Sequence, residues 1–254
     1  MSKQGAQIPR ILIAATQSGS GKTTITSGIL ELLRRSGITP QAYKVGPDYI
    51  DPTYLAAASG RAVHNLDTWL LPEDKMASIF AKSAAASDIA VVEGVMGLYD
   101  GGQGGISSSA SIAKLLKLPV ILVIDVKSMG DSAAAIALGF REYDKEVMLK
   151  GVILNKVGSE NHKKMVCDAM EKIGIPVFGA IFRNETAQIK ERHLGLLPEQ
   201  ENENKNHIKD IADAIAPNID LDAIIKTAQE APKLDTENES EKCGEKRVTI
   251  GVAQ

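Results

Sequence analysis

The segment RILIAATQSGSGKTT constrains this chain more than any other feature, because it joins an apolar strand-like run, a glycine-rich turn and a helical pattern. Thr16 stands where a phosphate-binding loop usually has its first glycine, whereas Gly19, Gly21, Lys22 and Thr23 are in register with that motif. Small residues are needed there because successive backbone N–H groups must point at phosphate oxygens, at the positive end of a helix dipole. The segment therefore favours a nucleotide-binding loop over an ordinary structural turn.

Within this loop, Lys22 is expected to reach the β- and γ-phosphates and the Thr23 hydroxyl is expected to bind Mg²⁺. The expected nucleotide contacts are Ser18, Gly19, Ser20, Gly21, Lys22, Thr23 and Thr24.

Apolar, β-branched runs alternate along the chain with segments of helical periodicity. The expected strands are Arg10–Ala15, Gln41–Val45, Ile89–Glu93, Val120–Asp125, Gly151–Asn155 and Pro176–Ile181. The expected helices are Thr23–Arg35, Pro72–Ala86, Ser108–Leu116, Asp131–Tyr143 and Glu160–Ile173. This alternation predicts an α/β fold of the P-loop NTPase type, with a parallel β-sheet and helices on both faces.

Composition excludes several functional classes. The net charge of −3 is too close to neutral for a chain that binds nucleic acid through its overall field. Cys167 and Cys243 are too few for a disulfide framework or a CxxC metal site, and they fit a reducing, cytoplasmic setting. Because the apolar runs are too short for a signal peptide or a membrane span, we expect neither nucleic acid nor a membrane as a partner.

The composition changes after residue 198. Residues 199–246 contain 13 acidic and 6 basic residues, which predicts an acidic helical or linker segment, and its last part, KLDTENESEKCGEK, is typical of a solvated linker. The final eight residues, RVTIGVAQ, return to a strand-like pattern. They suggest that a second domain begins at residue 247.

Carboxylates follow two of the expected strands. Mg²⁺ prefers hard oxygen ligands and usually takes one or two protein carboxylates beside phosphate oxygens. Glu93, at the end of IAVVE, and Asp48, in the turn after the second strand, are the candidates. A solvent-capped strand end is the alternative interpretation for Glu93, and an ordinary turn residue after Pro47 is the alternative for Asp48.

Asn155 ends the strand at which proteins with this loop recognise the base of the nucleotide. A guanine reader would need a carboxylate three residues later, and Gly158 cannot supply one. Adenine with Asn155 as its hydrogen-bond partner is therefore favoured, and a plain strand-end cap is the alternative.

Several motifs occur in a fixed order: TQSGSGKTT, KVGPDYIDPTYL, HNLDTW, VVEGVMGLYDG, ILNKV and RHLGLLP. In these motifs the chain resembles the cobyrinic acid a,c-diamide synthases, which are relatives of dethiobiotin synthetase. The resemblance implies that residues 1–198 are a P-loop ATP-dependent synthetase domain. It also implies that residues 247–254 begin a class I glutamine amidotransferase domain, truncated here, whose glutaminase Cys and His this chain lacks. A homodimer is compatible with it.

The implied activity is ATP- and Mg²⁺-dependent amidation of the a and c acetate side chains of a corrinoid in cobalamin biosynthesis, through an acyl phosphate that ammonia attacks. The implied catalytic residues are Lys22, Lys44, Asp48 and Glu93, and the implied Mg²⁺ ligands are Thr23, Asp48 and Glu93. These groups would balance the charge that develops on the transferred phosphoryl group.

The resemblance also suggests substrate contacts in HNLDTW and GLYDGG, namely Asn65, Leu66, Asp67, Tyr99, Asp100 and Gly101. A merely flexible connection is the alternative interpretation of the glycine-rich loop. Trp69 is compatible both with stacking on a macrocycle and with ordinary packing.

Three other functions remain open. A partition-type ATPase that dimerises around nucleotide would carry a lysine at position 17, where this chain has Gln17. Dethiobiotin synthetase would not require the acidic linker and the terminal strand. Amidation of nickel-sirohydrochlorin or hydrogenobyrinic acid would use the same mechanism, and the sequence does not separate these macrocycles.

Overall fold

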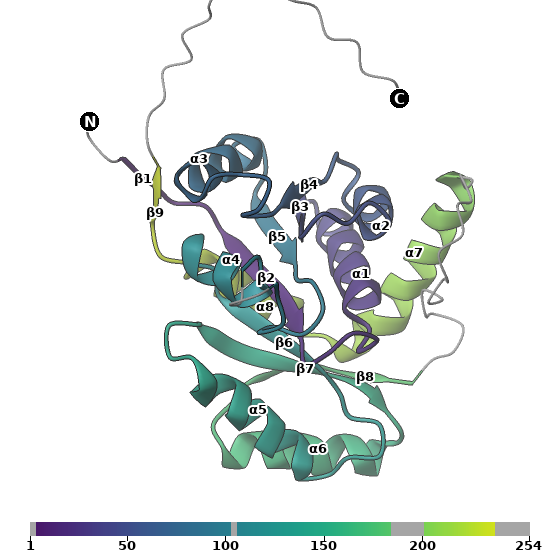
Figure 1. Cartoon of the computed structure of the whole chain (residues 1–254). Helices are drawn as coiled ribbons and strands as arrows, with labels where there is room; N and C mark the ends of the chain where they lie inside the picture. Colours follow the sequence, from purple (N-terminus) through teal and green to yellow (C-terminus); the bar gives the residue numbers. More distant parts are fainter. Residues whose placement is uncertain (1–3, 103–105, 184–200, 237–254) are drawn as a thin grey trace, which may run out of the picture.

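The computed structural model describes residues 4–102, 106–183 and 201–236. Its centre is a parallel sheet of seven strands in the order β4-β3-β5-β2-β6-β7-β8, with β2 in the middle (Figure 1). The strands are β2 (Arg10–Ala15), β3 (Pro40–Val45), β4 (His64–Leu66), β5 (Ile89–Glu93), β6 (Val120–Asp125), β7 (Leu149–Val157) and β8 (Val177–Phe182). The predicted parallel sheet is confirmed.

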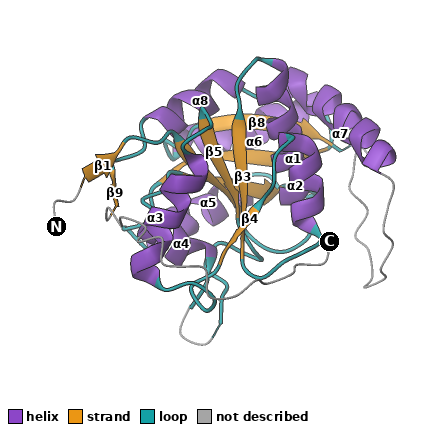
Figure 2. Cartoon of the chain, turned by 90° about the horizontal axis from the view of Figure 1, so that it is seen from above, coloured by secondary structure: helices purple, strands orange, loops and turns teal. Residues whose placement is uncertain are grey.

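Helices cover both faces of the sheet (Figure 2). One layer consists of α3 (Glu73–Ala84), α4 (Ser109–Leu115), α5 (Ser132–Tyr143) and α6 (Glu160–Lys172). The other consists of α1 (Lys22–Arg35), α2 (Asp51–Ser59), α7 (Glu201–Ile215) and α8 (Leu221–Gln229). Alternate residues of β2 enter the two cores: Leu12 packs with the first layer, and Ile11 and Ile13 pack with the second. This two-sided burial explains the continuous apolar runs of the strands.

The acidic segment forms part of the same body. Its helices α7 and α8, joined by a short 3₁₀ helix over Ala216–Asn218, contribute buried residues such as Ile211 and Ile224 to the second core. The packed body therefore extends beyond residue 198. At the start of the expected solvated linker, β9 (Leu234–Thr236) pairs antiparallel with β1 (Gln4–Ala6), and Leu234 is buried. The RHLGLLP motif and the terminal strand-like run lie outside the described residues.

Because all seven strands are parallel, their carboxyl ends meet at one edge of the sheet. The glycine-rich loop follows β2, the KVGPD turn follows β3, and Asn155 lies near the end of β7. The fold thus brings most of the predicted site to this edge. Within the described part of the chain, no helix is both long and apolar enough to cross a membrane.

Candidate nucleotide and carboxylate site

The loop between β2 and α1 has the backbone of a phosphate cradle. Gly19 and Gly21 have φ angles of 75° and 91°, in the left-handed region that favours glycine, and α1 begins directly afterwards at Lys22. The Ser20 hydroxyl donates to the Gln17 carbonyl at 2.9 Å and so fixes the turn. The N-terminal N–H groups of α1 therefore face the carboxyl edge, where an anion is favoured. Ser18 is exposed on the same loop, and Thr24 lies in the first turn of α1.

Two side chains near the end of β7 donate hydrogen bonds to backbone carbonyls of this loop. Asn155 Nδ2 donates to the Ser20 carbonyl at 2.9 Å, and a methyl group at Gly21 would lie 2.3 Å from that nitrogen. Lys156 Nζ donates to the Gly19 carbonyl at 3.1 Å and pairs with Asp125 at 2.7 Å. The residue predicted to read adenine thus contacts the phosphate loop. The sequence interpretation did not predict that Lys156 contacts the loop, although Lys156 adjoins Asn155 in the ILNKV motif.

His162 was also missed, because it lies in a polar helical stretch. Its Nδ1 accepts a hydrogen bond from the Gly158 N–H at 3.0 Å, and its Nε2 lies 2.7 Å from the Met129 carbonyl oxygen. The imidazole therefore joins the loops that follow β6 and β7.

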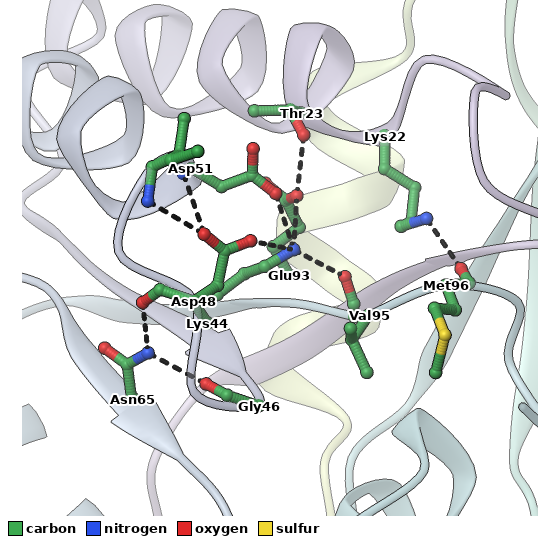
Figure 3. Close-up of polar contacts among 12 residues, drawn as sticks. Lys22, Thr23, Lys44, Gly46, Asp48, Asp51, Asn65, Glu93, Val95 and Met96 are labelled. Carbon is green, nitrogen blue, oxygen red and sulfur yellow. Dashed lines mark hydrogen bonds and ion pairs between the residues drawn. The ribbon is translucent and has the colours of Figure 1, made fainter. Parts of the chain in front are cut away.

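Glu93 is the most deeply buried charged group of the site, with no exposed surface. Its Oε1 accepts hydrogen bonds from the Thr23 hydroxyl at 2.8 Å and from Lys44 Nζ at 3.0 Å (Figure 3). Its Oε2 is buried and has no hydrogen-bond partner among the residues that the structure describes. Burial raises the pKa of Glu93, and the nearby Lys44 charge opposes that rise. An unsatisfied buried carboxylate oxygen is costly, so this oxygen is suited to bind a cation or a hydrogen-bond donor.

Lys44 links Glu93 to the turn after β3 (Figure 3). Its Nζ lies 2.8 Å from Asp51 Oδ2 and 3.9 Å from Asp48 Oδ2, and it donates to the Gly94 carbonyl. Burial alone would lower the pKa of Lys44, but the negative charges of Glu93 and Asp51 outweigh it and raise this pKa above its usual value. The charge of Lys44 likewise outweighs burial at Asp51 and lowers the pKa of that carboxyl.

Asp48 and Asp51 differ in their surroundings. Asp48 Oδ1 accepts the backbone N–H groups of Ile50 and Asp51, at 2.8 and 3.3 Å, so Asp48 shapes the turn as well as facing the site. Asp51, in the first turn of α2, is the carboxylate closest to Lys44 in this turn. The sequence interpretation favoured Asp48 and did not select Asp51, although both belong to the same motif.

Lys22 lies on the other side of Glu93. Its Nζ donates to the Met96 carbonyl at 2.6 Å, in the loop that follows β5 (Figure 3). Burial lowers the pKa of Lys22, although the charge of Glu93 partly offsets this effect. Lys22, Thr23 and Glu93 thus converge where β2 and β5 run side by side.

The predicted substrate residues after β4 are engaged within the protein. Asn65 Nδ2 donates to the carbonyls of Gly46 and Asp48, at 2.8 and 2.6 Å, and therefore holds the turn that carries Asp48. Leu66 is buried in the core, and Asp67 is 4% exposed. All three residues are thus engaged within the protein and support the site. A direct contact with substrate remains a prediction.

The residues predicted in the loop after β5 behave similarly. The Tyr99 hydroxyl donates to the Phe140 carbonyl on α5 at 2.6 Å, and burial raises the pKa of Tyr99 to about 12. Asp100 Oδ2 accepts the Gly97 N–H at 3.0 Å and closes a turn. Gly101 is exposed and leads to residues 103–105, which lie outside the described part.

The donor set fits a magnesium ion that is shared with a nucleotide. Thr23 supplies a hydroxyl oxygen, and Glu93 supplies the unpartnered Oε2. No group of three or more His, Cys, Asp or Glu side chains among the described residues could hold a metal by itself. A divalent ion here would therefore need phosphate oxygens as further ligands, which is the usual situation for Mg²⁺.

A glycine-rich loop at the N-terminus of a helix, a buried lysine and threonine, and a strand-end carboxylate on a parallel sheet define a P-loop nucleotide-binding protein. The chain shares its fold with chloroplast FtsY from Physcomitrella patens, which superimposes with a TM-score of 0.56 at 14% identity, over 89% of this chain and 66% of that one. More narrowly, the chain belongs to the CobQ/CobB/MinD/ParA nucleotide-binding domain family, whose model matches residues 11–197.

Its similar relatives include two kinds of diamide synthase. The chain is 47% identical to the cobyrinate a,c-diamide synthase of Picrophilus torridus, over 89% of this chain and 52% of the relative. It is 43% identical to the hydrogenobyrinate a,c-diamide synthase of Streptomyces coelicolor, over 90% of this chain and 48% of the relative. The chain thus spans about half the length of these relatives.

Proposed function

We propose that this chain is the ATP-dependent synthetase part of a cobyrinate a,c-diamide synthase. The proposal rests on the contacts of Glu93: its Oε1 accepts a hydrogen bond from Thr23 at the start of α1, and its Oε2 has no hydrogen-bond partner within the described part of the chain. This arrangement suits Mg²⁺ bound to the phosphates of a nucleotide at the loop. The names of the relatives, at 43–47% identity, supply the substrate class.

In the proposed site, Thr23, Glu93 and Asp48 would hold Mg²⁺ together with phosphate oxygens, and the ion would neutralise charge on the phosphates. The N–H groups of the loop and Lys22 would bind the phosphates, and Asn155, which supports the loop, would be the hydrogen-bond partner of adenine. Lys44 keeps Asp51 and Glu93 close together despite their like charges. Positioning and charge stabilisation are the main tasks in phosphoryl transfer.

The proposed reaction activates a poor acyl donor in two steps. An oxygen of the acetate carboxylate attacks the γ-phosphorus of ATP, and the bond to the β-phosphate oxygen breaks, so ADP leaves and an acyl phosphate forms. The nitrogen of ammonia then attacks the acyl carbon, phosphate leaves with the electron pair of the C–O bond, and nitrogen loses a proton to solvent. Because the carboxylate is already ionised, no general base is needed for the first step.

Ammonia is proposed to come from a glutaminase domain of the same longer protein, with residues 247–254 as its first strand. Cobyrinic acid is the proposed substrate, and hydrogenobyrinic acid is the second candidate because relatives of similar identity carry either name. The proposed setting is the cytoplasm.

The test is high-resolution mass spectrometry of each tetrapyrrole after incubation with the chain, ATP, Mg²⁺ and an ammonium salt. We expect two successive exchanges of OH for NH₂, together with ADP and phosphate. Lys22→Ala and Glu93→Gln should each lower the rate by about a hundredfold or more, because each removes a charge that is needed in the transition state. Lys164→Ala, an exposed lysine on α6, serves as the matched control.

A near-normal rate of ATP consumption in Lys22→Ala or Glu93→Gln would contradict the assigned roles. ATP binding without amidation of any tetrapyrrole would contradict the proposed substrate and favour the partition-type alternative.

A further inference from the structure

Exposed apolar side chains are unevenly distributed over the described surface. Six of the nine large ones lie in the three loops that follow β3, β4 and β5, and we call these six residues the apolar rim: Tyr49, Ile50, Trp69, Leu70, Met96 and Ile106. Trp69 is 81% exposed and Leu70 is 63% exposed. Single exposed apolar residues are normal, but a group on neighbouring loops indicates a binding surface.

The rim occupies one part of the carboxyl edge. Strands β4, β3 and β5 are adjacent in the sheet, and β2, β6, β7 and β8 form the other part. The phosphate loop follows β2, and Asn155 and Lys156 hold it from β7, so the nucleotide belongs to that second part. Glu93 ends β5, which pairs with β2, and therefore stands at the border between the two parts. If the nucleotide occupies the part of the edge after β2, the part that carries the apolar rim is available to the molecule that receives the phosphoryl group.

The turn that presents Trp69 is built on a buried carboxylate. Asp67 Oδ1 accepts the N–H groups of Trp69 and Leu70, at 2.6 and 3.2 Å, and the hydroxyl of Ser107 at 3.3 Å. The hydroxyls of Thr68 and Ser107 lie 2.9 Å apart and join this turn to the loop after β5. The buried Asp67 carboxylate thus fixes the turn that exposes Trp69 to solvent. The hydrophobic effect alone would favour burial of this side chain.

We infer that Trp69 and Leu70 form a platform for the flat apolar face of the tetrapyrrole macrocycle, with Asp67 as the residue that positions this platform. The inference rests on the proposed function. The macrocycle is a broad conjugated ring with carboxylate arms at its periphery, so a ring lying on the rim can extend one arm toward Lys22 and Glu93. Indole is the side chain best suited to such a surface, because it stacks over a large area at little entropic cost. Asp67 then acts through the turn that carries Trp69 and Leu70.

Trp69 is the single tryptophan of the chain, which gives a direct optical test. Titration with cobyrinic or hydrogenobyrinic acid should quench the Trp69 emission saturably. Trp69→Ala should raise the KM for the tetrapyrrole about tenfold, with kcat and the KM for ATP changed by less than about twofold, because a stacking contact adds uniform binding. Trp69→Phe should recover most of the affinity.

Asp67 is tested by its effect on the turn. Asp67→Ala should lower the anisotropy of the Trp69 emission in the free protein and raise the KM for the tetrapyrrole as Trp69→Ala does. Asp67→Asn retains an acceptor oxygen and should behave nearly as the parent chain. Met165→Ala removes a residue on α6 that is 51% exposed, away from the rim, and should change neither quantity.

The inference is overturned if amidation proceeds and Trp69→Ala leaves the KM for the tetrapyrrole within about twofold, while the proposed function stands. It is also overturned if the chain forms dimers that Trp69→Ala dissociates, because the rim would then contact a second copy. If the parent chain neither binds nor amidates any tetrapyrrole, the proposed function and the inference fail together.

Discussion

At the scale of single residues, Lys44 is the group on which the charge balance of the site depends. Its ammonium is nearly inaccessible and contacts two carboxylates within 3.0 Å, those of Asp51 and Glu93. A buried ion pair adds little net stability compared with apolar packing, but removal of one partner leaves an uncompensated buried charge. Lys44 therefore matters chiefly because Glu93 and Asp51 are present.

Lys44→Met should destabilise the chain by about 3–5 kcal/mol at pH 8. Without Lys44 the pKa of buried Glu93 should rise further above its unfolded value. The folded variant then binds a proton that the unfolded chain has released, so its stability falls as the pH rises from the unfolded pKa toward the folded pKa. Urea denaturation at pH 5, 6, 7 and 8 measures this slope.

Lys44→Met combined with Glu93→Gln is the matched control, because glutamine does not titrate and the added pH dependence should disappear. Parallel pH profiles for the parent chain and Lys44→Met would show that Glu93 does not depend on Lys44.

At the scale of elements, the second helix layer depends on a helix from the acidic segment. Ile208, Ile211 and Ile215 of α7 are buried in the same core as Ile25 and Ile29 of α1. Gly28 permits the close approach of the two helices, because a methyl group there would lie 2.4 Å from Ile215 Cδ1. Since α1 begins at Lys22, α7 supports the helix that carries the phosphate loop.

Ile211→Ala should cost about 2–5 kcal/mol in the free energy of unfolding, because it leaves a cavity between α7 and the rest of the core. Ile79→Ala on α3, where Ile79 is 40% exposed, should cost less than about 1 kcal/mol. Equal effects of the two variants in chemical denaturation would argue against a docked α7.

The elements also show what the sequence could predict. The six expected strands and five expected helices are present, with ends shifted by a few residues, because long apolar runs and helical periodicity dominate their burial. Neither β4, which is three residues long, nor α2, which follows a proline-containing turn, was predicted. In the site, the phosphate loop could be recognised locally. The contact between Thr23 and Glu93 spans 70 positions and depends on strand order, which periodicity does not encode.

At the scale of the whole molecule, Arg10 connects segments near both ends of the described chain to the sheet through hydrogen bonds. This arginine is fully buried, and its guanidinium donates to the carbonyls of Ile8, Leu116, Lys117 and Pro232. Burial lowers the pKa of Arg10 to about 10. The pairing of β1 with β9 continues this connection at the surface.

Arg10→Met should lower the free energy of unfolding by about 2–5 kcal/mol, because buried carbonyls lose their donors. Asp235→Asn breaks the exposed pair with Lys117, which joins the same segments, and should cost at most about 1 kcal/mol. Thermal and urea unfolding measure both variants. A loss for Arg10→Met no larger than that for Asp235→Asn would show that the buried arginine is not the main fastening.

The central place of β2 has a consequence for how the chain is made. β2 leaves the ribosome first among the seven parallel strands, yet its neighbours β5 and β6 are synthesised long after it, and the Pro232 carbonyl that Arg10 binds lies 222 positions away. Folding must therefore close large loops before the most buried strand gains its partners, which slows it. Until α8 has emerged from the ribosome, part of the apolar face of the central strands is uncovered. A nascent chain in that state is the form most prone to aggregation and to binding by chaperones.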